Sequence, residues 1–125
     1  MASTVTPNGY RRRQPFSFCP INSSWGLDNR TVGIRVIEGS DKATRIEKRD
    51  GTAEANPYLM LAAEISAGLE GIENGIEPSA MTEGNGYEDD SAEPIPTDLR
   101  DAVKRARESD WLKELCGDHM YELMC

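Results

Sequence analysis

The chain has 125 residues and a formal net charge of −8, which is enough sequence for one small domain with a modest core. The charge is uneven, because residues 1–49 contain nine Lys/Arg and four Asp/Glu, a balance of +5, whereas residues 50–125 contain five and eighteen, a balance of −13. An acidic chain of this kind is a poor candidate for binding nucleic acid or a membrane surface, and no apolar run is long enough to span a bilayer. The three cysteines and single histidine have neither metal-ligand spacing nor a disulfide framework, so we expect a cytoplasmic protein.

Residues 1–28 combine a short polar start with a basic run. For residues 1–7, which are small and polar, we expect disorder or the edge of a strand. The run Tyr10-Arg11-Arg12-Arg13 follows, and three consecutive arginines fit either a solvated basic patch or contact with an anionic partner. Trp25 precedes the first expected strand, and for this ring we predict a packing role without chemistry.

Two strand-like runs between residues 29 and 50 predict a hairpin that turns at Gly39-Ser40-Asp41. The side chains of a strand repeat every two residues, so alternate residues of each run share a face. With the runs paired, one face collects several guanidiniums around a single carboxylate: Arg35, Arg45, Arg49 and Glu47, with Arg30 at the edge. Such a face suits phosphates held by arginine forks and a divalent cation held by the carboxylate, or else it is a solvated face whose ion pairs contribute little.

The pair Asn56-Pro57 predicts the start of a long helix over about residues 56–73, with Asn as the N-cap and Pro at the first helical position. An apolar stripe follows at helical spacing, formed by Leu61, Ile65, Leu69 and Ile72. We expect this stripe to belong to the core and to support the strand that carries Arg45 and Glu47.

The remaining sequence divides into an acidic loop and a helical tail. Residues 76–96 are rich in Gly, Pro and acidic residues, which is typical of an exposed loop. Over residues 97–125 we predict a helix capped by Thr97, a shorter helix that ends at Gly117, and the start of another. The expected fold class is therefore α+β: an antiparallel sheet portion, which is the hairpin of about residues 30–50, backed by the long helix of about residues 56–73 and followed by the C-terminal helical tail.

Several spaced motifs occur in a fixed order along the chain. They are Asn29-Arg30 followed by Arg35, then the alternating set Arg45, Glu47 and Arg49, then Ala55-Asn56-Pro57-Tyr58-Leu59, and finally Ala62-Ala63, Ala67-Gly68-Leu69 and Gly71-Ile72. Together they closely resemble the C-terminal part of the glutamine synthetase catalytic domain, over nearly the whole chain from about Asn8. The resemblance implies four segments: a substrate and flap segment (residues 1–28), an active-site hairpin and helix (29–75), an acidic loop (76–96) and a truncated helical tail (97–125).

The resemblance implies an ATP-dependent ligase, a glutamine synthetase or a glutamate–amine ligase, that acts through γ-glutamyl phosphate on glutamate and on ammonia or a larger amine. Its cofactors would be ATP and Mg²⁺ or Mn²⁺. By position, Arg30 and Arg35 would be the catalytic contacts of the transferring phosphate, and Arg45 would join them in binding ATP. By the same comparison, the glutamate substrate would be bound by Arg12 and Arg49, and the metal ion by Glu47.

The flap departs from the family pattern at one informative position. Ammonia-using glutamine synthetases carry a glutamate before the last proline of this segment, where it helps to deprotonate ammonium. Here that position is Phe18, within Phe16-Ser17-Phe18-Cys19-Pro20. A phenyl ring accepts no proton, whereas its apolar surface suits the carbon chain of an amine, so the resemblance favours an acceptor larger than ammonia. A shifted flap and an inactive protein are the alternatives.

The resemblance also carries expectations about the whole protein. Family members are several times longer and their other metal ligands lie upstream, so we expect this chain to be a fragment or a truncated gene product that is inactive alone. The family forms ring-shaped homo-oligomers with active sites between subunits. Tyr87 lies near a tyrosine that is adenylylated in some bacterial members, but its surrounding motif is absent, and we do not expect that regulation. The competing interpretations are a non-catalytic glutamine-synthetase-like structural or assembly protein or remnant, and an unrelated small anion-binding module.

Overall fold

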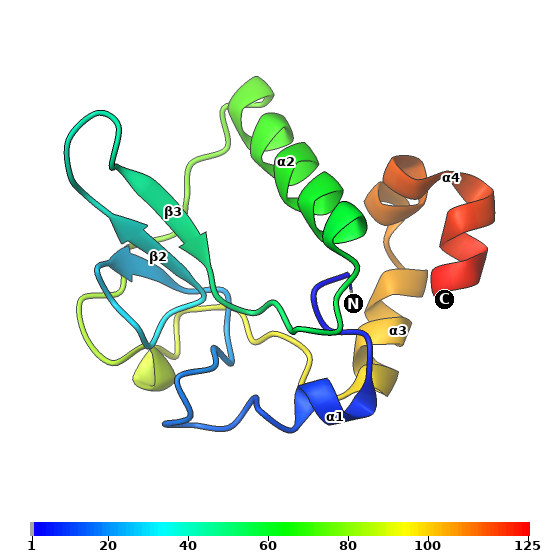
Figure 1. The fold of residues 1–125 in the computed structure, drawn as a ribbon, viewed down its shortest axis with the longest axis horizontal. Helices are drawn as coiled ribbons and strands as arrows, with labels where there is room; N and C mark the ends of the chain where they lie inside the picture. The colour runs from blue at the N-terminus through cyan, green and yellow to red at the C-terminus, as the bar shows by residue number, and fades with distance from the viewer. Residues whose placement is uncertain (1) are drawn as a thin grey trace.

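The computed structural model describes residues 2–125, with a small sheet on one side of the molecule and the longer helices toward the other (Figure 1). In chain order the elements are α1 (Pro7–Tyr10), β1 (Trp25–Leu27), β2 (Ile34–Ile37), β3 (Arg45–Lys48), α2 (Pro57–Glu73), the 3₁₀ helix η1 (Gly86–Glu88), α3 (Leu99–Arg107) and α4 (Asp110–Met124). The α+β class expected from the sequence is confirmed.

The sheet has three strands in the order β1-β2-β3. Strands β2 and β3 pair antiparallel, with Arg35 opposite Glu47 and Ile37 opposite Arg45, so the expected hairpin is confirmed. Strand β1 pairs with β2 in parallel, which makes the sheet mixed rather than antiparallel throughout. A strand of three residues is too short to show alternation in a sequence, which is why β1 was not expected. Trp25 begins this strand, and its indole Nε1 donates a hydrogen bond to the Ser79 carbonyl at 2.7 Å.

The buried side chains come mainly from residues 3–32. Val32 is fully buried, and Tyr10 is 3% exposed. The expectation of disorder or a strand edge for residues 1–7 is wrong for residues 2–7. Thr4 is fully buried, and its hydroxyl donates to the Asp50 carbonyl at 3.2 Å. The start of the chain is therefore fastened to the segment that follows β3.

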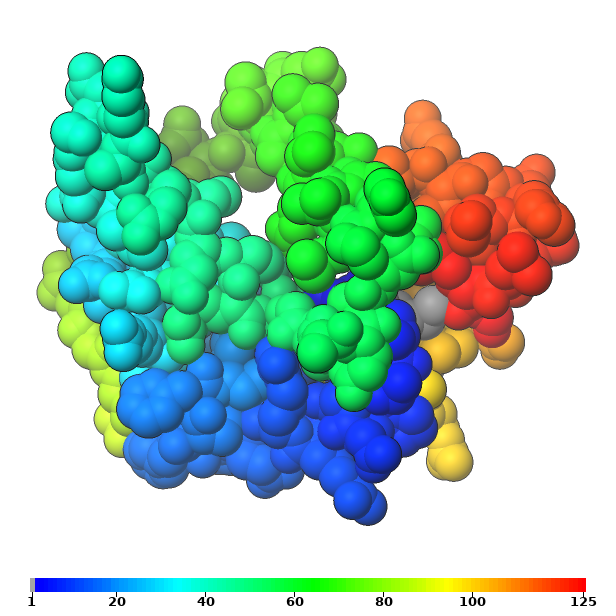
Figure 2. Space-filling model, in the orientation of Figure 1, coloured from blue at the N-terminus to red at the C-terminus, as the bar shows by residue number. Residues whose placement is uncertain are grey.

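Helix α2 begins where the Asn-Pro pair predicts, since the Asn56 side chain accepts a hydrogen bond from the Tyr58 N–H at 3.0 Å. The expectation that its apolar stripe belongs to the core is wrong, because no residue of α2 is buried and Ile65 remains 60% exposed. An ion pair of 2.7 Å between Lys48 Nζ and Glu64 Oε1 ties the helix to β3. Figure 2 nevertheless shows an open gap between α2 and the hairpin, so the helix flanks the sheet without burying its apolar face there.

The acidic residues 76–96 are only partly the exposed loop that their composition predicts. Thr82 and Gly86 are buried, and the Thr82 N–H donates to the Trp25 carbonyl at 2.9 Å. An isolated antiparallel bridge joins Asn22 to Pro94. The loop therefore runs alongside residues 19–31 and is fastened to them at several points.

The helical tail follows the expected pattern with one change. Asp98, rather than Thr97, caps α3, because its carboxylate accepts a hydrogen bond from the Asp101 N–H at 2.9 Å. Gly117 interrupts α4 with a φ of 70°, which glycine adopts readily. Among residues 2–125, no helix is both long enough and apolar enough to cross a membrane.

Candidate functional site

A carboxylate held between two guanidiniums lies on one face of the hairpin. Glu47 is directly opposite Arg35, and the Arg35 Nη1 to Glu47 Oε2 distance is 3.1 Å. The other carboxylate oxygen of Glu47 lies 3.4 Å from Nη1 of Arg49. The alternation of the sequence predicted that these three residues share a face; the register places Arg35 opposite Glu47, and Arg49, just beyond β3, contacts the same carboxylate.

Arg35 has a second carboxylate partner that the sequence analysis missed. Its guanidinium donates two hydrogen bonds to Oδ1 of Asp28, one of them from Nε at 3.0 Å. Hydrogen bonding and charge from Arg35 hold the pKa of Asp28 below its usual value, and the bonds from Asp28 and Glu47 raise the pKa of Arg35. Asp28 has a φ of 45°, so it sits in a left-handed turn before β2, where strand periodicity carries no information.

Arg12 and Arg49 lie together between the flap segment and the hairpin. Nη2 of Arg49 donates to the Phe18 and Arg30 carbonyls, each at 2.9 Å. Nη2 of Arg12 donates to the Arg49 carbonyl at 3.4 Å. The Nε atoms of Arg12 and Arg49 are both buried, with no hydrogen-bond partner among residues 2–125. Nε of Arg13 is also buried without a partner, although the other nitrogens of Arg13 bond to Pro96 and Thr4, so these orphan N–H groups do not by themselves mark a ligand site.

The side chains of Arg30 and Arg45 lie at the margins of this cluster. Arg45 is exposed, and its Nη1 donates to the nearby Ala43 carbonyl at 2.9 Å. Its partner in the register is Ile37, two residues along β2 from Arg35, or roughly 7 Å away along the strand. Arg30 borders a surface hollow formed by residues 27–31 and 81–84. The structure therefore brings Arg12, Arg35, Glu47 and Arg49 into one neighbourhood and places Arg30 and Arg45 at its margins.

The three consecutive arginines have three different environments. Arg11 is exposed and Arg12 is half-buried beside Arg49. Arg13 is 5% exposed, and its Nη1 donates to the Pro96 carbonyl while Nη2 donates to the Thr4 hydroxyl at 2.9 Å. Its guanidinium carbon also lies 4.8 Å from the centroid of the Tyr10 ring. The run is therefore neither one solvated patch nor one anion site.

The flap presents Phe18 where the family pattern has a carboxylate. The Phe18 side chain is 64% exposed, and its carbonyl accepts the hydrogen bond from Arg49 described above. No carboxylate of the flap is available there, because residues 14–20 contain no acidic side chain. The backbone of Phe18 therefore contacts the arginine cluster, while its apolar side chain is largely exposed.

A single carboxylate does not make a complete metal site. Residues 2–125 contain no group of three or more His, Cys, Asp or Glu side chains that could hold a metal ion. Glu47 is 41% exposed and already paired with two arginines. A divalent ion would therefore receive at most one carboxylate ligand from this face and would need further ligands from elsewhere.

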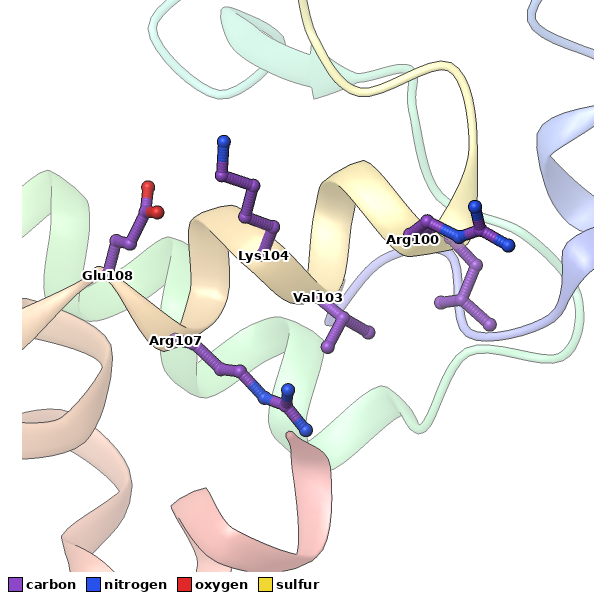
Figure 3. Close-up of a pocket in the computed structure, with 6 residues that line it drawn as sticks. Arg100, Val103, Lys104, Arg107 and Glu108 are labelled. Atoms are coloured by element: carbon purple, nitrogen blue, oxygen red, sulfur yellow. The ribbon is translucent and has the colours of Figure 1, made fainter.

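Another surface hollow lies along α3 and has a different character. It is lined by Leu99, Arg100, Val103, Lys104, Arg107 and Glu108, all from α3 and the residue that follows it. In Figure 3 the charged side chains of Arg100, Lys104 and Arg107 point in different directions rather than toward a common centre. No convergent polar group marks it as a site for chemistry.

Comparisons with known proteins agree with one another. The family model of the glutamine synthetase catalytic domain matches residues 2–125. The chain is 35% identical to a glutamine synthetase of Clostridium saccharobutylicum, over 97% of this chain and 29% of that protein. It is 38% identical to a glutamate–isopropylamine ligase of a Pseudomonas species, over 92% of this chain and 26% of that protein.

Two further matches extend the set of relatives. The chain is 41% identical to the γ-glutamylethanolamide synthetase GlnA4 of Streptomyces coelicolor, over 90% of this chain and 24% of that protein. A solved structure described as a GmaS/ADP complex superimposes with a TM-score of 0.80 at 29% identity, over 98% of this chain and 31% of that one. The chain thus spans 24–31% of the length of these relatives.

Proposed function

Because the chain belongs to the glutamine synthetase catalytic-domain family, we propose that it supplies the arginine-rich wall of an ATP-dependent active site that joins glutamate to ammonia or a larger amine. The observation that carries this proposal is the hairpin face. On it Arg35 and Arg49 flank Glu47, and Arg12 lies beside Arg49. A wall of fixed cations suits a reaction that passes through crowded oxyanions.

The proposed division of labour follows the two steps of the reaction. ATP phosphorylates the γ-carboxylate of glutamate, and the amine then displaces the phosphate. Arg30 and Arg35 contact the transferring phosphate, and Arg45, at the outer end of β3, contacts the ATP phosphates. Arg12 and Arg49 bind the carboxylates of glutamate. These five guanidiniums provide charge that is already in place when the oxyanion forms.

Glu47 contributes one ligand to a magnesium or manganese ion in this proposal, and the other ligands come from outside residues 2–125. The ion, when bound, neutralises phosphate charge. In its absence, Arg35 and Arg49 hold the Glu47 carboxylate in position on the hairpin. In this proposal the whole protein is cytoplasmic and forms a ring of identical subunits. Each active site lies between two neighbouring subunits.

The proposed acceptor is an amine larger than ammonia. The Phe18 carbonyl contacts Arg49, and its exposed apolar side chain stands at the sequence position where a carboxylate would serve ammonium. The glutamate–isopropylamine ligase and the γ-glutamylethanolamide synthetase among the relatives are named for acceptors of this class.

The test is an assay of the protein expressed from its complete gene. ATP, Mg²⁺, glutamate and one of ammonium, methylamine or putrescine are supplied, and the γ-glutamyl product is identified by mass spectrometry. We expect amide formation with a preference for a carbon-bearing amine.

Arg35→Lys keeps the positive charge but loses the planar, two-pronged guanidinium. We expect this substitution to slow the reaction about 100-fold. Arg11→Lys, at an exposed neighbour of Arg12, is the control and should leave the rate unchanged.

Each part of the proposal can be contradicted separately. Preference for ammonium would overturn the assignment of a larger acceptor while leaving the ligase in place. A protein that forms no amide and binds no nucleotide with Mg²⁺ would instead be a non-catalytic relative.

A further inference from the structure

Residues 14–19 carry two aromatic side chains on an unusual backbone. Phe16 has a φ of 63° and Phe18 a φ of 60°, in the left-handed region that bulky residues rarely adopt. Their side chains are 72% and 64% exposed, so burial of the rings does not explain this conformation. Contacts other than burial of the rings must therefore stabilise this backbone conformation.

Some of the stabilising hydrogen bonds are local to the segment. The Ser17 hydroxyl lies 2.7 Å from the Arg12 carbonyl and 2.6 Å from the Gln14 carbonyl, and it accepts from the Cys19 N–H at 3.2 Å. These bonds close the loop on itself but do not fix it relative to the hairpin.

Two distant residues fasten the segment to the rest of the molecule. From the hairpin, Arg49 donates to the Phe18 carbonyl at 2.9 Å. From the acidic loop, the Tyr87 hydroxyl donates to the Cys19 carbonyl at 3.1 Å. The Tyr87 ring also contacts Phe16, with centroids 5.4 Å apart and planes tilted by 46°, an arrangement that aromatic pairs favour.

Tyr87 is itself held firmly. Its N–H donates to the Asn85 side chain at 3.2 Å, which caps η1. The preceding residue, Gly86, donates from its N–H to the Thr31 hydroxyl and accepts from Nδ2 of Asn22, both at 2.7 Å. Thr31 directly follows Arg30, so the segment that contains Tyr87 is hydrogen-bonded to the residue next to one of the wall arginines.

We propose that Tyr87 is a positioning residue that holds residues 14–19 in place and thereby determines how the acceptor amine approaches the arginine wall. The inference rests on the proposed function, because it assigns the acceptor side of the site to the Phe16 and Phe18 rings. The favoured substrate is an amine whose carbon chain packs against these rings. Tyr87 touches neither glutamate nor ATP in this scheme; it acts through Phe16 and the Cys19 carbonyl.

The experiment compares three variants of the protein expressed from its complete gene. Tyr87→Phe removes the hydroxyl and keeps the ring, whereas Tyr87→Leu removes both contacts. Tyr121→Phe is the matched control, since it also removes a phenol-to-carbonyl bond, the 2.7 Å bond to Arg107 in the helical tail. Hydrogen exchange of the peptide that covers residues 14–19 reports on the flap. Steady-state kinetics with putrescine report KM for the amine and for glutamate separately.

We expect Tyr87→Phe to raise both the hydrogen-exchange rate of residues 14–19 and the KM for the amine about two- to tenfold. This is the range that the loss of one hydrogen bond predicts. Tyr87→Leu should exceed that effect because the ring contact is lost as well. The KM for glutamate should stay unchanged, and Tyr121→Phe should change neither quantity.

Three outcomes would overturn the inference. Unchanged exchange of residues 14–19 in Tyr87→Leu would show that Tyr87 does not hold the flap. Equal increases in the KM values for amine and glutamate would reduce Tyr87 to a general structural role. Faster hydrogen exchange of residues 14–19 with an unchanged KM for the amine would show that the flap does not affect binding of the acceptor amine. If the unsubstituted protein forms no amide, the proposed function fails instead, and with it the acceptor role of Tyr87; the exchange comparison then still decides whether the tyrosine holds the flap.

Discussion

The hairpin region and the long helix of this molecule are stabilised in different ways. Around the hairpin, hydrogen bonds join residues far apart in the chain, such as Asn22 to Gly86 and Ser3 to Asp50, and Val32 is fully buried. Helix α2 has no buried residue and keeps its apolar stripe exposed. The arginine wall therefore owes its geometry to polar contacts and a few tightly packed residues rather than to the packing of the longest helix. Three substitutions test that difference, each against a matched control.

The largest effect is expected from Gly86→Ala. An added Cβ would lie 2.6 Å from the Thr31 carbonyl oxygen, and that obstacle is backbone that cannot rotate away. We expect the free energy of unfolding of the 125-residue chain to fall by about 3 kcal/mol. Gly84→Ala is the control, because nothing lies within 4 Å of its added Cβ. Urea unfolding measures both, and equal small losses would show that the loop is not tightly fitted to residues 31–32.

A second comparison sets Val32→Ala against Ile65→Ala. Val32 is fully buried, so loss of two methyl groups should cost about 2 kcal/mol. Ile65 is 60% exposed on α2, and its truncation should cost about 0.5 kcal/mol or less. Similar losses at the two sites would indicate that the α2 stripe is covered in solution. Repeating the urea titration at several protein concentrations would then show whether another copy covers it.

The smallest effect is expected from Asp50→Asn, and it should depend on pH. Burial alone would raise the pKa of Asp50, but the charge of Lys48 and the Ser3 hydroxyl, 2.6 Å away, hold it below its usual value. A folded-state pKa below the unfolded value stabilises the fold above pH about 4, and this contribution disappears as the pH falls through the folded pKa.

We therefore expect Asp50→Asn to lower the free energy of unfolding by about 1–2 kcal/mol at pH 7, and by much less at pH 3. Asp41→Asn, at an exposed residue of the hairpin turn, is the control and should change little at either pH. A loss from Asp50→Asn that is the same at both pH values would contradict the assignment to the ionised carboxylate.

The elements with a strong local signal could be predicted from the sequence. Alternation placed Arg35 and Glu47 on one face, and Asn56-Pro57 marked the start of α2. Contacts between distant segments could not be predicted, because no local pattern encodes them. Asp28 reaches Arg35 from a left-handed turn, and Tyr87 reaches the flap across 68 positions of the chain. The error over the α2 stripe has the same origin, since periodicity identifies an apolar face but not its partner.

The three environments of the basic run also bear on how this protein can change over generations. We expect lysine to be tolerated at position 11, because the Arg11 side chain is exposed. At position 13 the same exchange would be harmful, since one ammonium cannot reach the Pro96 carbonyl and the Thr4 hydroxyl as a planar fork does. Arg12 donates a hydrogen bond to the Arg49 carbonyl and, in the proposed function, also binds glutamate, so both roles would constrain position 12. Three adjacent and chemically identical residues are thus constrained differently: weakly at position 11, by the fold and the proposed substrate at position 12, and by the fold at position 13.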